Sequence, residues 1–241
     1  MEKKVREKRT YLTIVDVLVV AIILFGSAII ASSYGYLNLA NNVATVDDNI
    51  NFSALDDYYG IIKQSLLLLL AFGYLYLRKF DFSVWKIKFN LKVIGKGVLF
   101  FIIAALAMDI YTVTMMKIFP APMMNATSEV GFSNFFTLSR ILYSLLNGFY
   151  EEIFFLGVCL SVKPKSLKWV IPLSLIIRFS FHTYQGMITA IGLGFVLGAV
   201  FYLLYFKSKK KNLAPFFIAH TIADIFGLSI LFIIQSLPMF S

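Results

Sequence analysis

The 241-residue chain is 59% hydrophobic and 15% charged, with a mean hydropathy of +0.81, which excludes a soluble domain and indicates a polytopic membrane protein. Its net charge of +9 does not indicate nucleic-acid binding, because the lysines lie in short loops between apolar runs. The one cysteine, Cys159, excludes an intrachain disulfide and a multi-cysteine metal site.

Apolar runs follow a short basic head at residues 1–10. We predict that they are transmembrane helices, because about 20 apolar residues cross a bilayer. The first run exceeds the apolar core of a signal peptide, so we expect an uncleaved anchor. The seven predicted spans are 11–33, 59–77, 93–119, 134–162, 169–184, 187–206 and 213–237. The expected fold is therefore all-α, a polytopic membrane helix bundle.

The connecting segments differ in character. Residues 34–58 are polar and acidic and are predicted to form a loop, as are residues 120–133. Residues 78–92 alternate basic and apolar side chains, so we expect a short amphipathic element on the membrane surface, with a solvated loop as the alternative. We divide the chain into an N-terminal membrane region, residues 1–133 with three spans, and a core, residues 134–241 with four.

Lysine and arginine mark one side of the predicted bundle. They are concentrated in the segments 1–10, 78–92, 163–168 and 207–211, and the opposite loops hold almost none. By the positive-inside rule, the N-terminus is cytoplasmic and the C-terminus, after seven spans, lies outside. We expect a multi-pass protein of the cell membrane.

Charged and imidazole side chains interrupt the fourth, fifth and seventh predicted spans. They are Glu151, Glu152, Arg178, His182, His220 and Asp224. A charge at the centre of a membrane helix costs about 2.5–3.5 kcal/mol on the translocon scale, so such residues usually mark function. Arg178 and His182 share a helix face, as do His220 and Asp224, because each pair is four residues apart. Three helices can thus direct these groups into one cavity.

Three further polar residues lie in predicted spans. Asn147 shares a face with Glu151, because the two are four residues apart. Asp16, near the start of the first span, is expected at the membrane interface. Asp109, in the third span, stands alone and is expected to have a structural or interfacial role.

Two carboxylates and two imidazoles around a hydrated cavity suit hydrolysis of a peptide bond. One carboxylate would activate water as a general base, and a histidine oriented by Asp224 would stabilise the oxyanion or protonate the leaving amine. Zinc bound by the two histidines and two glutamates is the alternative. Adjacent residues point about 100° apart on a helix, so the Glu pair should chelate poorly, and we expect no cofactor.

At these residues the chain resembles the CPBP family of intramembrane endopeptidases, also called the Abi or CAAX-protease-like family. The family motifs are Glu-Glu-x-x-x-Arg, Phe-x-x-x-His and His-x-x-x-Asn or Asp, on successive helices. Their matches here are Glu151-Glu152, His182 and His220-x-x-x-Asp224, in the same order and spacing. Leu156 replaces the motif Arg and Arg178 replaces the motif Phe. Residues 178–186 resemble a bacterial subset with Arg-x-x-x-His-x-Tyr-Gln-Gly.

The resemblance implies that residues 134–241 form a catalytic core that cleaves a membrane-associated peptide or protein. Glu151 would activate water, with Glu152 and Arg178 in support. His182 and His220 would be catalytic or stabilise the oxyanion, with Asp224 at the Asn position. Arg178 is expected to pair with a glutamate or to hold a substrate carbonyl.

Two other functions stay open. One is a non-catalytic membrane regulator or bacteriocin-immunity protein, which would bind a partner membrane protein such as a sensor through lateral helix contacts. The other is a proton-coupled carrier, against which the small size and the lack of internal repeats argue.

Overall fold

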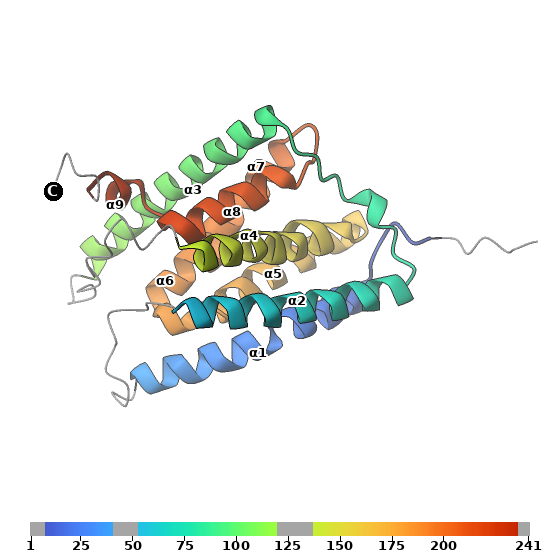
Figure 1. The fold of residues 1–241 in the computed structure, drawn as a ribbon, viewed down its shortest axis with the longest axis horizontal. Coiled ribbons are helices and arrows are strands. Elements are labelled where there is room, and N and C mark those ends of the chain that lie inside the picture. The colour runs from blue at the N-terminus through green and yellow to red at the C-terminus, as the bar shows by residue number, and fades with distance from the viewer. Residues whose placement is uncertain (1–7, 41–52, 120–136, 236–241) are drawn as a thin grey trace, which may run out of the picture.

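The structure, a computed structural model, describes residues 8–40, 53–119 and 137–235. Within these ranges the regular elements are all helices, and the only strand-like pairings are isolated bridges. The long helices run side by side as a bundle (Figure 1). The predicted all-α helix bundle is therefore confirmed.

Five helical units are long and apolar enough to cross a membrane. Three are single helices, α1 (Ile14–Ala40), α2 (Ala54–Leu77) and α3 (Leu91–Ile118). Two contain a π-helical segment in the middle of the unit. These are α4 (Leu138–Glu152) with η3 (Ile153–Val158) and η4 (Cys159–Ser161), and α6 (Met187–Ile191) with η7 (Gly192–Leu197) and α7 (Gly198–Lys207). The chain is thus a multi-pass membrane protein.

The other two predicted spans contain shorter helices, α5 (Leu167–Ser180) and α8 (Ala214–Phe226). At 1.5 Å per residue, α8 is about 20 Å long, less than the ~30 Å apolar layer. The prediction of one continuous helix over 213–237 is wrong. Gly227, with φ +81°, ends α8, and a separate helix α9 follows at Ile230–Gln235.

The predicted loop over residues 34–58 is wrong at both ends. The helix α1 continues to Ala40, and α2 begins at Ala54. Ser53 accepts a hydrogen bond from the Asp56 backbone and donates to the Asp56 carboxylate, a capping box that fixes the start of α2. The remainder of this loop, and the predicted loop at 120–133, lie outside the described residues.

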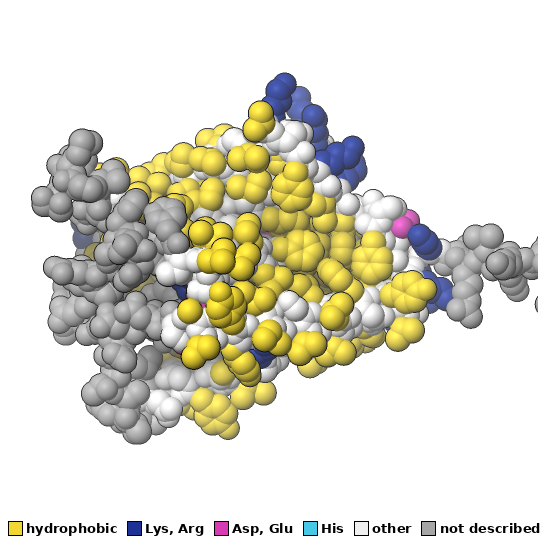
Figure 2. All heavy atoms as spheres, viewed as in Figure 1, with side chains coloured by type: hydrophobic (Ala, Val, Ile, Leu, Met, Phe, Trp, Pro, Cys, Tyr) yellow, Lys and Arg dark blue, Asp and Glu magenta, His cyan; other side chains and the backbone are white. Residues whose placement is uncertain are grey.

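Residues 78–92 are tied to the bundle rather than lying free on its surface. They contain a short 3₁₀ turn, η1 (Phe82–Val84), and form bridges from Phe80 to Arg9 and from Lys86 to Asn212. We call the end of the bundle formed by residues 8–12, 78–90, 161–168 and 207–213 the basic end. Figure 2 shows Lys and Arg side chains gathered there, with hydrophobic side chains over the flank. The helix α9 lies at the opposite end (Figure 1).

Glycines let α8 approach its neighbours. A Cβ atom at Gly148 of α4 would lie 2.7 Å from Thr221 Oγ1 and 2.8 Å from the Phe217 carbonyl oxygen. A Cβ atom at Gly97 of α3 would lie 2.6 Å from Ile218. Small residues allow this close backbone contact in membrane proteins. The contact brings His220 of α8 against the Glu pair of α4.

The two isolated aspartates have structural partners. Asp16, in the first turn of α1, is 2% exposed and accepts hydrogen bonds from Tyr74 (2.7 Å) and Arg78 (2.7 Å), so it is buried against α2 near the basic end. Asp109 accepts hydrogen bonds from the Ser229 hydroxyl (2.5 Å) and the Ile230 backbone (2.9 Å). It thereby caps α9, a structural role as expected.

Candidate active site

The Glu pair lies where α4 changes into the π-helix η3. Glu151 is 6% exposed and Glu152 is fully buried. A π-helical turn inserts one extra residue into a helix and is frequent at functional sites. The change in helical pitch therefore begins directly after the two carboxylates.

Glu152 is held by one guanidinium group, from Arg178, and one imidazole group, from His220. Arg178 Nη2 lies 2.5 Å from Glu152 Oε1, and His220 Nδ1 lies 2.8 Å from the same oxygen. The Arg178 guanidinium is also buried, 4.0 Å above the Phe155 ring. Of the two roles expected for Arg178, the structure shows the pairing with a glutamate. Leu156, at the motif Arg position, is 2% exposed and apolar.

Glu151 is held much more loosely. Its Oε1 accepts one hydrogen bond, from Asn147 Nδ2 at 3.3 Å. Its Oε2 lies 3.8 Å from His220 Nε2, too far for a direct hydrogen bond. The two adjacent carboxylates thus have different environments, one neutralised by a guanidinium and one open towards an imidazole nitrogen.

Asp224 closes the group from the other side of His220. Its Oδ1 lies 3.5 Å from His220 Nε2, and its Oδ2 accepts a hydrogen bond of 2.9 Å from Asn147. Asn147 in turn accepts a hydrogen bond of 2.7 Å from Gln64 of α2. The sequence showed that Asn147 shares a face with Glu151, but gave it no role. Gln64 was missed, because one polar residue in an apolar run carries no spacing signal.

His182 joins this group through the backbone of Arg178 and not through a carboxylate. It is half-buried in the turn after α5, and its Nδ1 donates to the Arg178 carbonyl at 2.7 Å. Since a carbonyl only accepts, Nδ1 carries the proton and Nε2 is left as an acceptor. His182 is therefore linked to Glu152 through Arg178, whose carbonyl accepts from His182 and whose guanidinium contacts Glu152.

Several buried polar atoms of the site have no hydrogen-bond partner among the described residues. They are Glu151 Oε2, Glu152 Oε2 and Arg178 Nη1. Such atoms in a native structure call for an ordered water or a ligand.

The site offers a partial set of metal ligands. Glu151, Glu152 and His220 each present a ligand atom within 4.8 Å of the others, so the Glu pair is less divergent than its helical spacing suggests. However, Arg178 lies 2.5 Å from Glu152 Oε1, and His220 Nδ1 is committed to the same oxygen. A guanidinium in contact with a ligand carboxylate opposes a bound cation, so these residues fit zinc poorly.

Residues 133–226 match the family model described as Rce1-like, type II CAAX prenyl endopeptidase Rce1-like. This part of the chain is similar to that family. The match spans the Glu pair, Arg178, both histidines and Asp224, and it confirms the resemblance to the CPBP family. The Rce1-like segment supports, in general terms, an intramembrane protease of the CAAX type. No curated protein and no solved structure matches the chain.

Proposed function

We propose that the protein is an intramembrane endopeptidase that hydrolyses a membrane-associated peptide or protein, with Glu151 as the general base. The observation that carries the proposal is the unequal treatment of the two carboxylates. Glu152 Oε1 receives both Arg178 and His220, whereas Glu151 Oε2 is buried, without a hydrogen-bond partner, and 3.8 Å from His220 Nε2. A base needs an open lone pair and a charge that is not already neutralised. Glu152 Oε2 also lacks a hydrogen-bond partner among the described residues, but its carboxylate is paired with Arg178, whereas that of Glu151 is not.

In this mechanism Glu151 takes a proton from a water while the water oxygen attacks the scissile carbonyl carbon. The carbonyl oxygen becomes an oxyanion, stabilised by the Nε2–H of His220, which acts as an imidazolium because its Nδ1–H is donated to Glu152. Protonated Glu151 then gives the proton to the amide nitrogen as the C–N bond breaks, which releases an amine and a carboxylic acid. Glu152 holds His220 Nδ1, and Asp224 orients Nε2. We assign His182 to the same reaction because its Nε2 is an unused acceptor.

The proposed reaction is of the glutamate type and uses no metal, which the contact between Arg178 and Glu152 supports. We also propose a position in the cell membrane with the N-terminus in the cytoplasm and the C-terminus outside. The gathering of basic segments at one end, with α9 at the other, supports this orientation (Figures 1 and 2).

A second candidate is a non-catalytic regulator that binds a partner such as a membrane sensor. The burial of the Glu pair favours it, because an ion pair enclosed in this way can also serve to hold helices together. In that case Glu151 would contribute packing and hydrogen bonding only.

The test compares membrane peptides in cells that lack the protein with those in cells that express wild type or Glu151→Gln. We expect a precursor that accumulates uncut in the null strain and with Glu151→Gln, because loss of a general base slows a reaction about 10²–10⁴-fold. Asp81→Asn, at the basic end, is the control and should restore processing. Quantitative peptide mass spectrometry gives the readout.

Processing by Glu151→Gln at the wild-type rate would contradict the enzyme and favour the regulator. Purified protein provides the metal arm, in which cleavage of the precursor should be unaffected by a zinc chelator. Loss of activity on chelation and recovery with added zinc would contradict the metal-free mechanism.

A further inference from the structure

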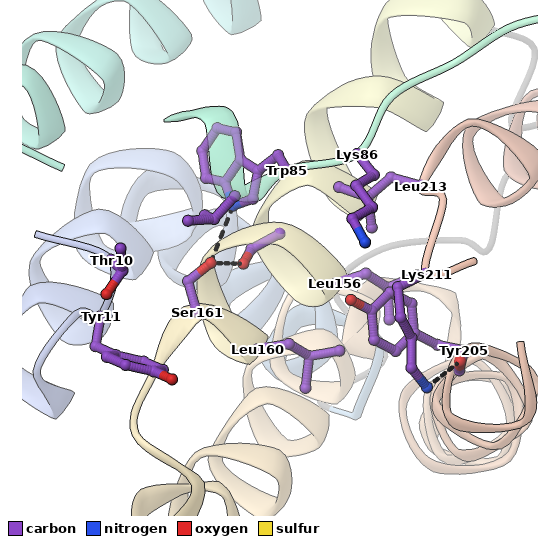
Figure 3. A pocket seen from close by; sticks show the side chains of 12 residues that line it. Thr10, Tyr11, Trp85, Lys86, Leu156, Leu160, Ser161, Tyr205, Lys211 and Leu213 are labelled. Atoms are coloured by element: carbon purple, nitrogen blue, oxygen red, sulfur yellow. Dashed lines mark hydrogen bonds between the residues drawn. The ribbon is translucent and has the colours of Figure 1, made fainter. Parts of the chain in front are cut away.

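A pocket of about 220 Å³ opens at the basic end, away from the Glu pair. Four segments that are distant in the sequence form its walls: residues 10–11, residues 84–86, residues 156–161 and residues 205–213 (Figure 3). All four lie where membrane-crossing helices begin or end. The pocket therefore sits at the level where the apolar layer of a bilayer meets the headgroups.

The lining combines apolar and aromatic side chains. Leu156, Leu160 and Leu213 are apolar. Tyr11 and Trp85 are aromatic residues of the type that anchors proteins at the membrane interface. The Trp85 Nε1–H donates to the Ser161 hydroxyl at 3.0 Å, and the Leu213 backbone donates to the Lys86 carbonyl at 2.9 Å. These bonds fix the walls relative to one another.

The pocket carries two positive charges and no negative one among its lining residues. Lys211 donates to the Tyr205 and Phe206 carbonyls at 3.0 and 2.7 Å, which leaves it one N–H. The Lys86 ammonium makes no hydrogen bond or ion pair with a described residue and points towards the centre of the pocket (Figure 3). Lys86 is exposed, so its ammonium is available to an anion that enters the pocket.

We propose that this pocket binds the headgroup phosphate of an anionic phospholipid, with Lys86 as its main ligand. Basic pockets between membrane helices suit acidic lipid headgroups, because a phosphate oxygen accepts charge-assisted hydrogen bonds from ammonium groups. A phospholipid seated here would place its phosphate between Lys86 and Lys211 and its acyl chains along the apolar flank of the bundle. The proposal is independent of the proposed peptidase activity.

The chain supplies its own reporter. It has two tryptophans, Trp85 and Trp169, and Trp169 is 65% exposed. The variant Trp169→Phe therefore leaves the pocket tryptophan as the only one. We would place it in lipid nanodiscs and compare quenching of its fluorescence by brominated phosphatidylglycerol and brominated phosphatidylcholine. We expect brominated phosphatidylglycerol to quench the Trp85 fluorescence to the same extent at a mole fraction at least fivefold lower than brominated phosphatidylcholine.

Lys86→Gln in the same background should abolish this difference between the two lipids. Lys88→Gln is the matched control, because Lys88 is exposed, lies in the same segment and does not line the pocket. Equal quenching by both lipids, or equal effects of the two substitutions, would overturn the proposal. If soluble glycerol phosphate at equal concentration displaced the brominated lipid, the proposal of a lipid ligand would be wrong, and the site would be assigned to a free phosphate ester.

Discussion

Arg178 joins two parts of the site that are separate in the sequence. Its side chain contacts Glu152 at 2.5 Å, and its carbonyl accepts the His182 Nδ1–H at 2.7 Å. In the family motif the guanidinium is four residues after the second glutamate, on the same helix. Here it comes from the last turn of α5, which places it against Glu152.

Replacing Arg178 by Met should destabilise the protein by about 3–5 kcal/mol, because it leaves a buried carboxylate without its cation. Reversible unfolding of purified protein in detergent provides the measurement. Lys92→Met, at an exposed lysine of α3, is the control and should change stability by less than about 0.5 kcal/mol.

The double variant Glu152→Leu with Arg178→Met should be less destabilised than the sum of the two single variants, because neither charge is then left unpaired. Additive effects would contradict the ion pair as a stabilising unit.

Asn147→Leu should lower kcat about ten- to hundredfold with little change in KM. The side chain donates to Glu151 and Asp224 but is not expected to contact the substrate, and removing a buried donor costs about 1–3 kcal/mol. Steady-state kinetics on the identified precursor give the readout. Gln64→Leu should act in the same direction and more weakly, because Gln64 reaches the carboxylates only through Asn147. A raised KM with unchanged kcat would contradict this positioning role.

At the scale of elements, the contact between α4 and α8 decides whether the site exists. At Gly148, three residues before Glu151, the backbone of α4 is in close contact with α8. The π-helix η3 then carries the rest of the unit to the basic end. Hydropathy predicts neither feature, because a bundle with α8 a few ångströms further from α4 would have the same pattern of apolar and polar residues.

Gly148→Ala should cost about 1–3 kcal/mol of stability and reduce activity, because the new Cβ would meet the Phe217 carbonyl at 2.8 Å and force α8 outwards. Thermal unfolding and precursor cleavage measure the two effects. Gly73→Ala in α2 is the matched control, because no atom lies within 4 Å of its Cβ position. Equal behaviour of the two variants would contradict the close-contact explanation.

At the scale of the whole molecule, the two ends of the bundle differ in charge and in chemistry. The basic end holds the lysine-rich segments and the pocket, and the other end holds α9 and the capping residue Asp109. The Rce1-like segment contributes residues 161–168 and 207–213 to the basic end, and it packs against α2 through Gln64 and against α3 through Gly97.

The proposed orientation predicts which end a membrane-impermeant maleimide can reach in intact cells. Leu55→Cys, 79% exposed at the start of α2, should be labelled from outside. Lys88→Cys, at the basic end, should be labelled only after permeabilisation. The native Cys159 is fully buried and should stay unlabelled, which makes wild type the control. The reverse pattern would invert the topology.

Some features were predictable because they depend on residues close together in the chain. Hydropathy located the long helices, and four-residue spacing placed Arg178 with His182 and His220 with Asp224. The start of α2 was predictable as well, from Ser53 and Asp56, but the polarity of this capping box was mistaken for that of a loop. The break at Gly227 was missed because one glycine hardly changes the hydropathy of an apolar run.

The sequence by itself determined a multi-pass helical protein, a basic side, and a set of polar residues belonging to one Rce1-like segment. Only the tertiary structure decided that Arg178 takes Glu152 and leaves Glu151 open, that Asn147 and Gln64 support the carboxylates, and that a basic pocket forms at one end. These outcomes depend on distances of a few ångströms between helices far apart in the chain. Such distances are set by glycine contacts and side-chain packing, which periodicity and composition do not encode.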